Sequence, residues 1–548
     1  MQIAAPAATR QGGGLAYKWI VAIVVVFGIF MSILDSTIVN IAIPRLQSAF
    51  GADLNSVQWV LTGYTLAQGV ATPLTAFLSE RIGIKRFYLI SLVGFTLGSV
   101  LCGLAWSLPV LIIFRILQGA TGAFLMPLAI TLLYREFPPQ ERGTAMGFLG
   151  IPILLAPAFG PSLGGYMVTF ASWQFIFFIN LPIGILGAIL AMVYLREARS
   201  EARVGFDIPG FLLSASGLGC LLYGLSDAST DGWTSTRVLS FLIAGIILLA
   251  IFTFVELDLS RREKQPLLDL RVFGNGLFTT SNIASILVTF ALYGGLFLVP
   301  VYLQNLRQLS AYQAGLLLLP QAFASMIAVL VGGRLVDRFG VRAVVIPGLL
   351  IMAFAMWQLS SLSLSIPYGT FQITLIIRGF GIGLCIQPLM VSALAQINPR
   401  RLGQATAVMT TLRFVSGSLA VAIIATLVQS QTKIHYTHLS ERVTAVSPLG
   451  QIIPRLQALF ISHGAPTGAA YTASLQVISG LLRRQSYMLA IQDAFWLSLV
   501  LAIVAVIAAL FVNGKPRQPL PQESEERPLT EAEREEEAKA REEAMIAV

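Results

Sequence analysis

Apolar residues occur in long uninterrupted runs, and most polar stretches between these runs are only long enough to form turns. A helix needs about 20 mostly apolar residues to cross the hydrocarbon core of a bilayer. Runs of this length predict fourteen membrane-spanning helices, near residues 18–43, 56–79, 87–106, 108–133, 143–168, 173–195, 207–226, 237–256, 277–304, 312–333, 341–362, 368–395, 402–428 and 488–512. The pattern therefore predicts an all-α membrane protein.

The composition agrees with this prediction and excludes an ordinary soluble domain. Of the 548 residues, 56% are hydrophobic and 11% are charged, whereas soluble domains carry about 25% charged residues. The formal net charge is +9, but the basic residues lie at the ends of apolar runs and not in a patch interleaved with aromatic residues. We therefore expect a lipid bilayer around the chain and no binding to nucleic acid.

The distribution of Lys and Arg predicts the orientation, because cytoplasmic loops carry an excess of both residues. With the N-terminus inside, seventeen basic residues fall in cytoplasmic connections, and only Arg45, Arg237 and Arg307 fall in short outer ones. The apolar run after Lys18 is too long for the core of a signal peptide, so we expect an uncleaved first span. These features predict a multi-pass protein of the cytoplasmic (inner) membrane with both termini in the cytoplasm.

Two segments outside the predicted spans differ from the short connections. The one long outer connection, residues 429–487, contains all three histidines, His435, His438 and His463. Two nearby histidines and a distant third make a poor metal site, so we expect no metal there. The tail after Gly514 is Pro-rich and then acidic, and Thr530 with Glu533 resembles a capping box that opens a charged helix; a solvated tail is the alternative.

The chain contains an internal repeat. Residues 76–85, between the second and third spans, match residues 333–342, between the tenth and eleventh: a small residue, an acid four positions later, then Arg and Gly. Arg115 and Arg378, each close to several glycines, form a second matching pair; the two offsets are 257 and 263 residues. Spans 1–6 thus recur as spans 9–14, with two spans inserted. Parallel six-span halves predict alternating access around a central site.

The predicted organisation follows from this repeat. A cytoplasmic segment (1–17) precedes an N-terminal six-helix bundle (18–195), and two inserted helices with their linkers occupy residues 196–274. A C-terminal six-helix bundle (275–512) includes the long outer connection, and an acidic cytoplasmic tail (513–548) ends the chain.

Residues 34–44, 111–119 and 150–165 form distinct motifs in the first, fourth and fifth predicted spans. These motifs resemble those of the major facilitator superfamily and, within it, the fourteen-span drug:proton antiporters of the EmrB/QacA type: the first-span signature of this branch, the span-four motif and the span-five antiporter motif. Residues 173–184 and 298–304 add shorter matches. The resemblance covers nearly the whole membrane region, and it implies a major facilitator fold with 14 transmembrane helices (6 + 2 inserted + 6) in two pseudo-two-fold related halves.

The resemblance implies a transporter and not an enzyme. We expect a proton-coupled antiporter that exports small amphipathic or monocationic compounds by alternating access, driven by the proton-motive force without a cofactor. We expect a monomer, with a periplasmic adaptor as a partner where the envelope has two membranes. Two alternatives stay open: a dedicated exporter of one endogenous lipid, siderophore or antibiotic, and a non-transporting membrane scaffold or sensor.

Asp35 is the only carboxylate deep within a span of the first half. Counted at 1.5 Å per residue, it lies about 25 Å along its helix from Lys18, and Arg115 in the antiparallel fourth span reaches the same layer. Asn180 in span six lies at a similar depth. An ionisable group inside a membrane is costly and is by default a functional site. We predict that Asp35 and Arg115 carry proton coupling; a permanent structural ion pair is the alternative.

Three further sets of residues are functional candidates. One set is expected to latch the cytoplasmic side and comprises Glu80, Arg81, Gly83, Asp337, Arg338 and Gly340. For its basic members the alternative is that they only set the membrane topology. The antiporter motif, expected to act as a hinge or seal, with tight packing as the alternative, comprises Gly150, Gly160, Pro161, Gly164 and Gly165. The substrate-cavity candidates, for which helix–helix hydrogen bonding is the alternative, are Asn40, Tyr64, Gln68, Gln118, Asn180, Tyr293, Gln321, Gln387 and Arg413.

The sequence departs from the family pattern in two respects. The first cytoplasmic turn has Glu80 where relatives have Asp, and Ala76 replaces the leading Gly. Some relatives also carry acids within spans two, ten or thirteen, whereas these spans contain none here. The missing carboxylates weaken any expectation of dicationic substrates.

Overall fold

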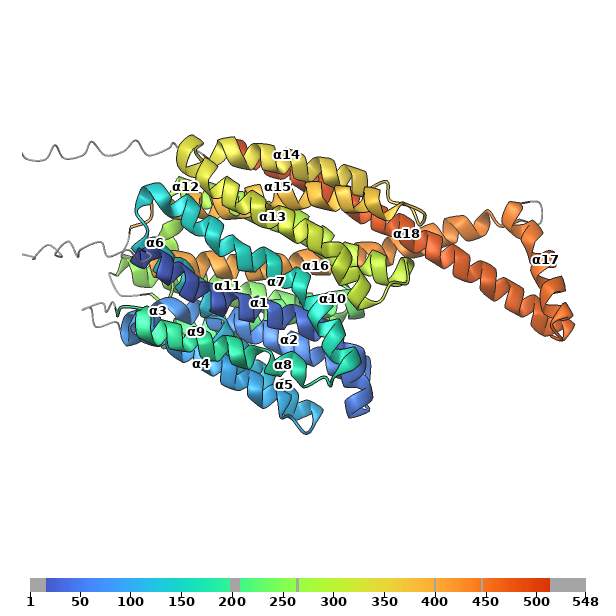
Figure 1. Ribbon diagram of the computed structural model, residues 1–548, viewed down its shortest axis with the longest axis horizontal. Helices are drawn as coiled ribbons and strands as arrows, with labels where there is room; N and C mark the ends of the chain where they lie inside the picture. Colours follow the sequence, from blue (N-terminus) through green and yellow to red (C-terminus); the bar gives the residue numbers. More distant parts are fainter. Residues whose placement is uncertain (1–15, 198–206, 263–265, 399–400, 445–446, 513–548) are drawn as a thin grey trace, which may run out of the picture.

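The computed structural model describes residues 16–197, 207–262, 266–398, 401–444 and 447–512, and these form helices without a β-strand (Figure 1). The predicted all-α architecture is therefore confirmed for the described part of the chain. The predicted tail helix around Thr530 and most of the N-terminal segment lie outside the described residues.

The first bundle comprises α1 (Tyr17–Phe50), α2 (Leu54–Ala71), η1 (Thr72–Leu74), α3 (Thr75–Ile82), α4 (Ile84–Gly103), α5 (Leu108–Gly122), α6 (Leu125–Glu136), η2 (Pro139–Glu141), α7 (Arg142–Phe170), α8 (Phe175–Phe178) and α9 (Asn180–Tyr194). The inserted pair is α10 (Ile208–Asp231) and α11 (Thr236–Arg261). The second bundle comprises η3 (Leu270–Gly274), α12 (Gly276–Val301), η4 (Tyr302–Leu306), α13 (Ala311–Phe339), α14 (Val341–Leu359), α15 (Tyr368–Leu394), α16 (Leu402–Glu441), α17 (Pro448–Ser462) and α18 (Thr467–Leu510).

Thirteen helical segments of the described chain are long and apolar enough to cross a membrane. The difference from the predicted fourteen concerns residues 56–79, which the structure divides among α2, η1 and α3. The 3₁₀ turn η1 contains Pro73. Proline lacks a backbone N–H donor, and it therefore interrupts the α-helical hydrogen bonds at this point. These three elements follow one another without a gap, so residues 54–82 are one helical stretch that is long enough to cross a membrane. It is less apolar than the thirteen segments, because residues such as Gln58 and Gln68 interrupt its apolar sequence.

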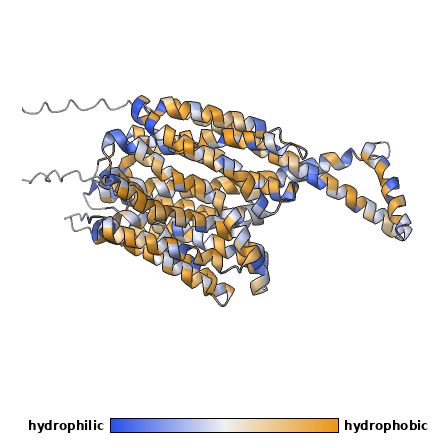
Figure 2. Cartoon of the chain, viewed as in Figure 1, coloured by the Kyte–Doolittle hydropathy of each residue, from blue (hydrophilic) through white to orange (hydrophobic). Residues whose placement is uncertain are grey.

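The two bundles pack side by side along α7 of the first and α13 of the second (Figure 1). One apolar core lies within the second bundle, and another fills the first bundle and continues into α15 and α16 of the second. In the inserted pair, α10 packs against α2 and α16, and α11 packs against α10. Large apolar side chains such as Leu97, Ile246 and Phe254 stay exposed on the outside, where hydrocarbon is their natural solvent. Figure 2 shows this apolar character along the whole helical body.

The start of α1 and the end of α18 lie at the same end of the body, here called the termini end (Figure 1). A helical hairpin projects from the opposite end, and we call this segment, residues 429–487, the arm. With 40 and 44 residues, α16 and α18 are about 60 and 66 Å long, roughly twice the thickness of a bilayer core. Because both helices also cross the body, they must extend beyond the membrane. The predicted outer connection is thus largely helical, with α17 at its tip.

The repeated turns that the sequence predicts have the same backbone geometry in both halves. Gly83 joins α3 to α4 with a φ of 98°, and Gly340 joins α13 to α14 with a φ of 83°. Residues with a side chain rarely adopt such positive angles. A single glycine therefore separates two consecutive helices in each half.

Candidate functional site

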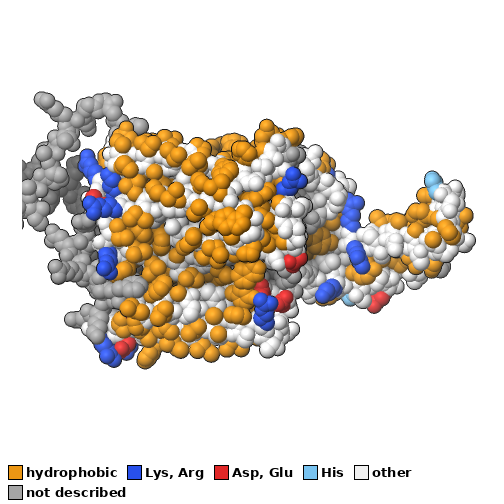
Figure 3. All heavy atoms as spheres, turned by 90° about the horizontal axis from the view of Figure 1, so that it is seen from below, with side chains coloured by type: hydrophobic (Ala, Val, Ile, Leu, Met, Phe, Trp, Pro, Cys, Tyr) orange, Lys and Arg blue, Asp and Glu red, His pale blue; other side chains and the backbone are white. Residues whose placement is uncertain are grey.

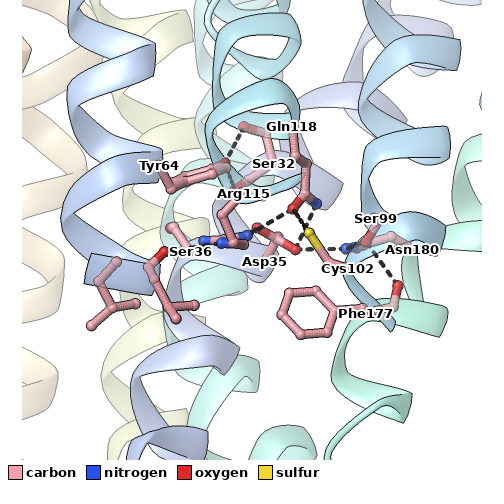
Figure 4. A network of polar contacts seen from close by, with 12 residues as sticks. Ser32, Asp35, Ser36, Tyr64, Ser99, Cys102, Arg115, Gln118, Phe177 and Asn180 are labelled. Carbon is pink, nitrogen blue, oxygen red and sulfur yellow. Dashed lines mark hydrogen bonds and ion pairs between the residues drawn. The ribbon is translucent and has the colours of Figure 1, made fainter. Parts of the chain in front are cut away.

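A fully buried carboxylate, Asp35 of α1, lies at the centre of a polar network inside the first bundle (Figure 4). Its Oδ2 lies 2.5 Å from Nη1 of Arg115, which comes from α5 and is also fully buried. Its Oδ1 accepts hydrogen bonds from Asn180 Nδ2 of α9, at 2.8 Å, and from Gln118 Nε2 of α5, at 3.0 Å. All three partners are donors, so the arrangement fits an ionised carboxylate.

Arg115 spreads its guanidinium over several partners besides Asp35. Its Nε donates to the Val60 carbonyl of α2 at 3.1 Å, and its Nη1 donates to Gln118 Oε1 at 2.8 Å. The guanidinium carbon lies 3.9 Å from the centroid of the Tyr64 ring, within the range of a cation–π contact. A buried ion pair recovers its desolvation cost only when further hydrogen bonds satisfy both groups. This site supplies such bonds from three helices, but the buried Nη2 of Arg115 has no hydrogen-bond partner among the described residues.

Two hydrogen-bond chains extend the network into neighbouring helices. On one side Asn180 also donates to Ser99 Oγ of α4 at 2.9 Å, and Ser99 donates to the Phe177 carbonyl at 2.9 Å. On the other side Gln68 donates to the Tyr64 hydroxyl at 3.0 Å, and that hydroxyl lies 3.3 Å from the Ser32 carbonyl. These contacts connect Asp35, directly or through its partners, to α1, α2, α4, α5 and α9.

The structure brings four of the predicted cavity residues into this network or its margin: Tyr64, Gln68, Gln118 and Asn180. Asn40 lies elsewhere, because its exposed side chain bonds the Ser36 carbonyl one turn earlier in α1. The network thus contains the predicted polar residues of the first bundle that are closest in depth to Asp35. It does not include Asn40, which lies nearer the end of α1.

The cavity candidates of the second bundle do not form a comparable cluster. Gln387 of α15 is buried against α7, where a methyl group at Gly150 would meet its Cγ at 3.0 Å. Arg413 of α16 is half-buried and interacts electrostatically with Tyr293 of α12. Gln321 of α13 lies against α15. These four side chains are dispersed among different helix contacts.

Arg378 shows how the repeat has diverged. Like its counterpart Arg115 it is fully buried, and it donates to the Leu292 carbonyl of α12 at 2.9 Å beside Gly295. The sequence of α12, which corresponds to α1, contains no acidic residue. The described residues therefore hold a buried arginine–carboxylate pair in the first bundle and no equivalent pair at Arg378.

At the termini end, Asp337 connects the two bundles. Its carboxylate accepts hydrogen bonds from the backbone N–H groups of Gly143 and Thr144, both at 2.9 Å, and from Thr144 Oγ1 at 2.8 Å. These groups open α7, where free N–H groups and the helix dipole favour a negative charge. Asp337 of one bundle therefore caps a helix of the other.

The remaining members of the repeated turns contribute differently. Arg81 and Arg338 are exposed, and each contacts a neighbouring ring, Phe77 at 5.8 Å and Phe339 at 5.2 Å. Partial burial raises the pKa of the Glu80 carboxyl above its usual value, and the charge of Arg135 opposes this effect. Of these three residues, Asp337 therefore contacts the other bundle, whereas Arg81 and Arg338 contact rings of their own helices.

The residues of the antiporter motif, four glycines and Pro161, lie where α7 contacts α1 and α13. A methyl group at Gly160 would come within 2.3 Å of Thr37 Oγ1 in α1, and one at Gly164 within 3.3 Å of the Ile38 carbonyl. On the opposite side a methyl group at Gly165 would lie 3.3 Å from the Tyr312 nitrogen of α13. The motif therefore allows close packing on both sides of the helix that joins the two bundles.

Two acidic residues with defined contacts, one exposed and one buried, were not predicted from the sequence. Glu197 accepts hydrogen bonds from the backbone N–H groups of Lys85 and Arg86 at the start of α4, both at 3.2 Å. Glu256 of α11 is fully buried and contacts the Asp207 carboxyl before α10. Glu197 lies more than a hundred residues from the helix that it caps, so no local pattern could have indicated its contact.

The arrangement of two bundles, a repeated glycine turn and a buried charge pair has a parallel among known families. Residues 25–421 match the sequence profile of the Major Facilitator Superfamily. The chain belongs to this superfamily. The predicted resemblance is confirmed at this level, and the protein is a membrane transporter and not an enzyme.

Individual members of the Major Facilitator Superfamily align along most of the chain. An uncharacterised MFS-type transporter, YhcA, of Bacillus subtilis is 34% identical over 92% of this chain and 94% of its own length. The tetracenomycin C resistance and export protein of Streptomyces glaucescens is 31% identical, with 94% and 95% covered. The multidrug export protein EmrB of Haemophilus influenzae is 27% identical, with 89% and 94% covered.

A solved structure supports the fold independently. A crystal structure of a double-tryptophan mutant of XylE superposes with a TM-score of 0.58 over 92% of this chain and 97% of that chain, at 14% sequence identity. At that identity the likeness concerns the major facilitator fold alone.

Proposed function

We propose that this transporter is a proton-coupled antiporter that exports small amphipathic or monocationic compounds by alternating access. The observation that carries the proposal is the buried pair of Asp35 and Arg115, 2.5 Å apart within the first bundle. Relatives named for multidrug export and for antibiotic resistance and export support the direction and the substrate class.

In the proposed mechanism, proton binding at Asp35 changes the contacts among the helices of the first bundle. The ionised carboxylate holds α1 to α5 and α9 through Arg115, Gln118 and Asn180. A proton on Asp35 removes the charge that Arg115 balances, and breaking a buried ion pair in this way costs about 3–5 kcal/mol. The protonated form is therefore favoured in a second conformation in which water or other groups reach Arg115.

The proton-motive force supplies energy on the same scale as this change. One elementary charge that crosses a potential of 100 mV gains about 2.3 kcal/mol. The described conformation, in which Asp35 receives three donors, corresponds to the deprotonated state of the cycle. Because Asp35 is fully buried there, a cationic substrate would reach it only after the network opens.

We further propose that Asp337 stabilises the conformation in which the termini end is closed. Thr131 Oγ1 of α6 lies 3.1 Å from Thr406 Oγ1 of α16, and Tyr134 donates to the Val391 carbonyl of α15 at 2.8 Å. These contacts and the Asp337 cap join the bundles at one end. The excess of Lys and Arg in connections at that end supports its placement in the cytoplasm, in a cytoplasmic membrane.

A dedicated exporter of a self-made antibiotic is the second candidate. The similarity to the tetracenomycin C resistance and export protein, over 94% of this chain, favours it over other single substrates. Drug-susceptibility profiles of a deletion strain and an overexpressing strain distinguish a broad substrate range from a single compound.

Substrate/proton exchange in inverted membrane vesicles tests the proposed function. Asp35→Asn should leave the protein in the membrane and abolish substrate-dependent proton release. Asp258→Asn is the matched control, because it removes the same charge at an exposed position of α11 and should exchange normally. Full exchange by the Asp35 variant would refute the coupling role and leave the ion pair as a structural element.

A further inference from the structure

A pocket of about 660 Å³ lies where the arm joins the body. It is lined by the parts of α16 and α18 that first extend beyond the body, and by η4 with the residues that follow it. It belongs neither to the Asp35 network nor to the contacts between the bundles. Its lining residues are Asn305, Leu306, Gln308, Thr432, Lys433, Tyr436, Thr437, Arg483, Arg484 and Tyr487.

The charges of the pocket are all positive. Lys433, Arg483 and Arg484 line it, and no lining residue is acidic. Arg484 donates to the Leu306 carbonyl at 2.7 Å, which holds its guanidinium against η4. The acidic residue Asp493 of α18 does not line the pocket, and its Oδ2 lies 2.7 Å from His435 Nε2 of α16. The pocket therefore offers three cations to a ligand without an internal counter-charge.

The backbone at the edge of the pocket is unusual. Residues 302–306 form a π-helical turn, a geometry that is rare and frequent at functional sites. Gln308 follows with a φ of 58°, and it is the one non-glycine residue with a positive φ in the described part of the chain. Such a conformation costs about 1–3 kcal/mol and persists only where surrounding contacts hold it. Here the Gln308 side chain donates to the Asn305 carbonyl at 2.6 Å.

The pocket lies at the depth of the lipid headgroups. The apolar part of α16 ends at Val428, and that of α18 begins at Met488, so the lining residues occupy the boundary between body and arm. Tyr436 and Tyr487 fit this depth, because tyrosine prefers the membrane–water interface. Exposed apolar side chains lie beside the cations, with Ile434 at 44% and Leu481 at 47% exposure. Figure 3 shows basic side chains where the arm leaves the body.

We propose that this pocket binds the phosphate of an anionic lipid headgroup in the leaflet at the arm end of the protein. Arg and Lys bind phosphate through charge-assisted hydrogen bonds, and basic pockets between membrane helices suit lipid headgroups. A bound lipid would join η4 to α16 and α18 and so fix the arm relative to the body.

Lipid retention by the full-length protein tests this inference. Protein in mixed micelles with equal mole fractions of phosphatidylglycerol and phosphatidylcholine of the same chains is analysed by native mass spectrometry. The wild type should retain phosphatidylglycerol preferentially. In Lys433→Gln/Arg483→Gln the preference should fall about fivefold for each cation removed. Arg484 is left unchanged, because its bond to Leu306 contributes to the local structure.

Two matched variants separate a specific site from other effects. Arg442→Gln/Arg455→Gln removes two charges from the arm outside the pocket and should keep the preference. Lys433→Arg/Arg483→Lys keeps the charges and should keep it too, which excludes misfolding as the cause of a loss. Equal loss in both neutralised variants would overturn the proposal in favour of general surface charge.

The source of the phosphate is decided in a further arm of the experiment. Inorganic phosphate and glycerol 3-phosphate are added to the wild type in phosphatidylcholine micelles, and the midpoint of thermal unfolding is measured. The proposal expects no shift at millimolar concentrations and a shift with phosphatidylglycerol. An equal shift with the soluble anions would overturn the lipid assignment.

Discussion

Neutralising Asp35 and Arg115, singly and together, separates the stabilising role of the pair from its role in coupling. In Asp35→Asn, Arg115 keeps the Val60 carbonyl and Gln118 Oε1 but loses its counter-charge. In Arg115→Gln, Asp35 keeps the amide donors of Gln118 and Asn180 but is left with an uncompensated negative charge. The double variant contains no buried charge at this site.

The expected magnitudes follow from complete burial, because both side chains have 0% exposure. Removing one partner of a buried ion pair costs about 3–5 kcal/mol, whereas replacing both partners by neutral groups is often nearly neutral. The double variant should therefore be more stable than either single variant. With single losses of about 3–5 kcal/mol each and a nearly unchanged double variant, the interaction energy of the cycle should be about 6–10 kcal/mol.

Thermal unfolding of the purified variants and exchange in vesicles are the two measurements. A second cycle on Asp258 and Arg262 of α11 is the control, because this pair is exposed and its N–O distance is 2.9 Å. Exposed pairs within one helix contribute about 0.3–0.5 kcal/mol. The control cycle should therefore be close to additive.

The two measurements should disagree in the double variant: stability recovers, and exchange does not. Additive losses of stability at Asp35 and Arg115 would show that the charges are not coupled as their geometry implies. Recovery of exchange together with stability would show that the pair is needed only for folding, and the proton-coupling proposal would fail.

Three further changes test other parts of the structure. Asp337→Asn removes the negative charge that caps α7 and should cost about 1.5–3 kcal/mol, measured as a lower midpoint of thermal unfolding than that of the Asp258→Asn control; equal midpoints would show that the cap does not stabilise the contact between the bundles. Because burial raises the pKa of Glu80, the folded wild type binds a proton more readily than the unfolded chain, and its stability falls as pH rises from about 4.3 through the raised pKa. Glu80→Gln removes this dependence. As the pH rises over that range, the unfolding midpoint of Glu80→Gln should therefore increase relative to that of the wild type; a constant difference between the two midpoints would contradict the raised pKa of Glu80. Gly160→Ala should destabilise by about 1–3 kcal/mol, because the methyl group meets Thr37, and adding Thr37→Ala should restore part of the loss; no restoration would place the strain elsewhere.

Prediction from sequence succeeded best along the membrane normal. A helix rises by a constant 1.5 Å per residue, so counting from Lys18 put Asp35, Arg115 and Asn180 in one layer, and the structure has them in contact. The same regularity made the runs of about 20 apolar residues identifiable as spans. The predicted span at residues 56–79 is a continuous helical stretch in the structure, but a 3₁₀ turn at Pro73 divides it and it is less apolar than the other thirteen segments.

Prediction was weaker around each helix axis. Tyr64 and Gln118 were candidates on composition alone, as was Asn40, yet only the first two face the buried pair. Ser99 bonds Asn180, but serine is too common in apolar helices to be singled out. Which side of a helix meets which neighbour depends on contacts between distant segments, and the hydrophobic pattern is nearly uniform around a buried helix.

The sequence by itself therefore determined the membrane class, the number of long apolar segments to within one, the six-span repeat and the depth of Asp35. Those features depend on local composition and on the fixed geometry of the helix. Only the tertiary structure decided that Asp35 receives three donors, that Asp337 caps a helix of the other bundle and that Arg378 has no carboxylate partner of the kind that Arg115 has. These outcomes depend on the packing of helices far apart in sequence, where a rotation of one helix exchanges a buried partner for lipid.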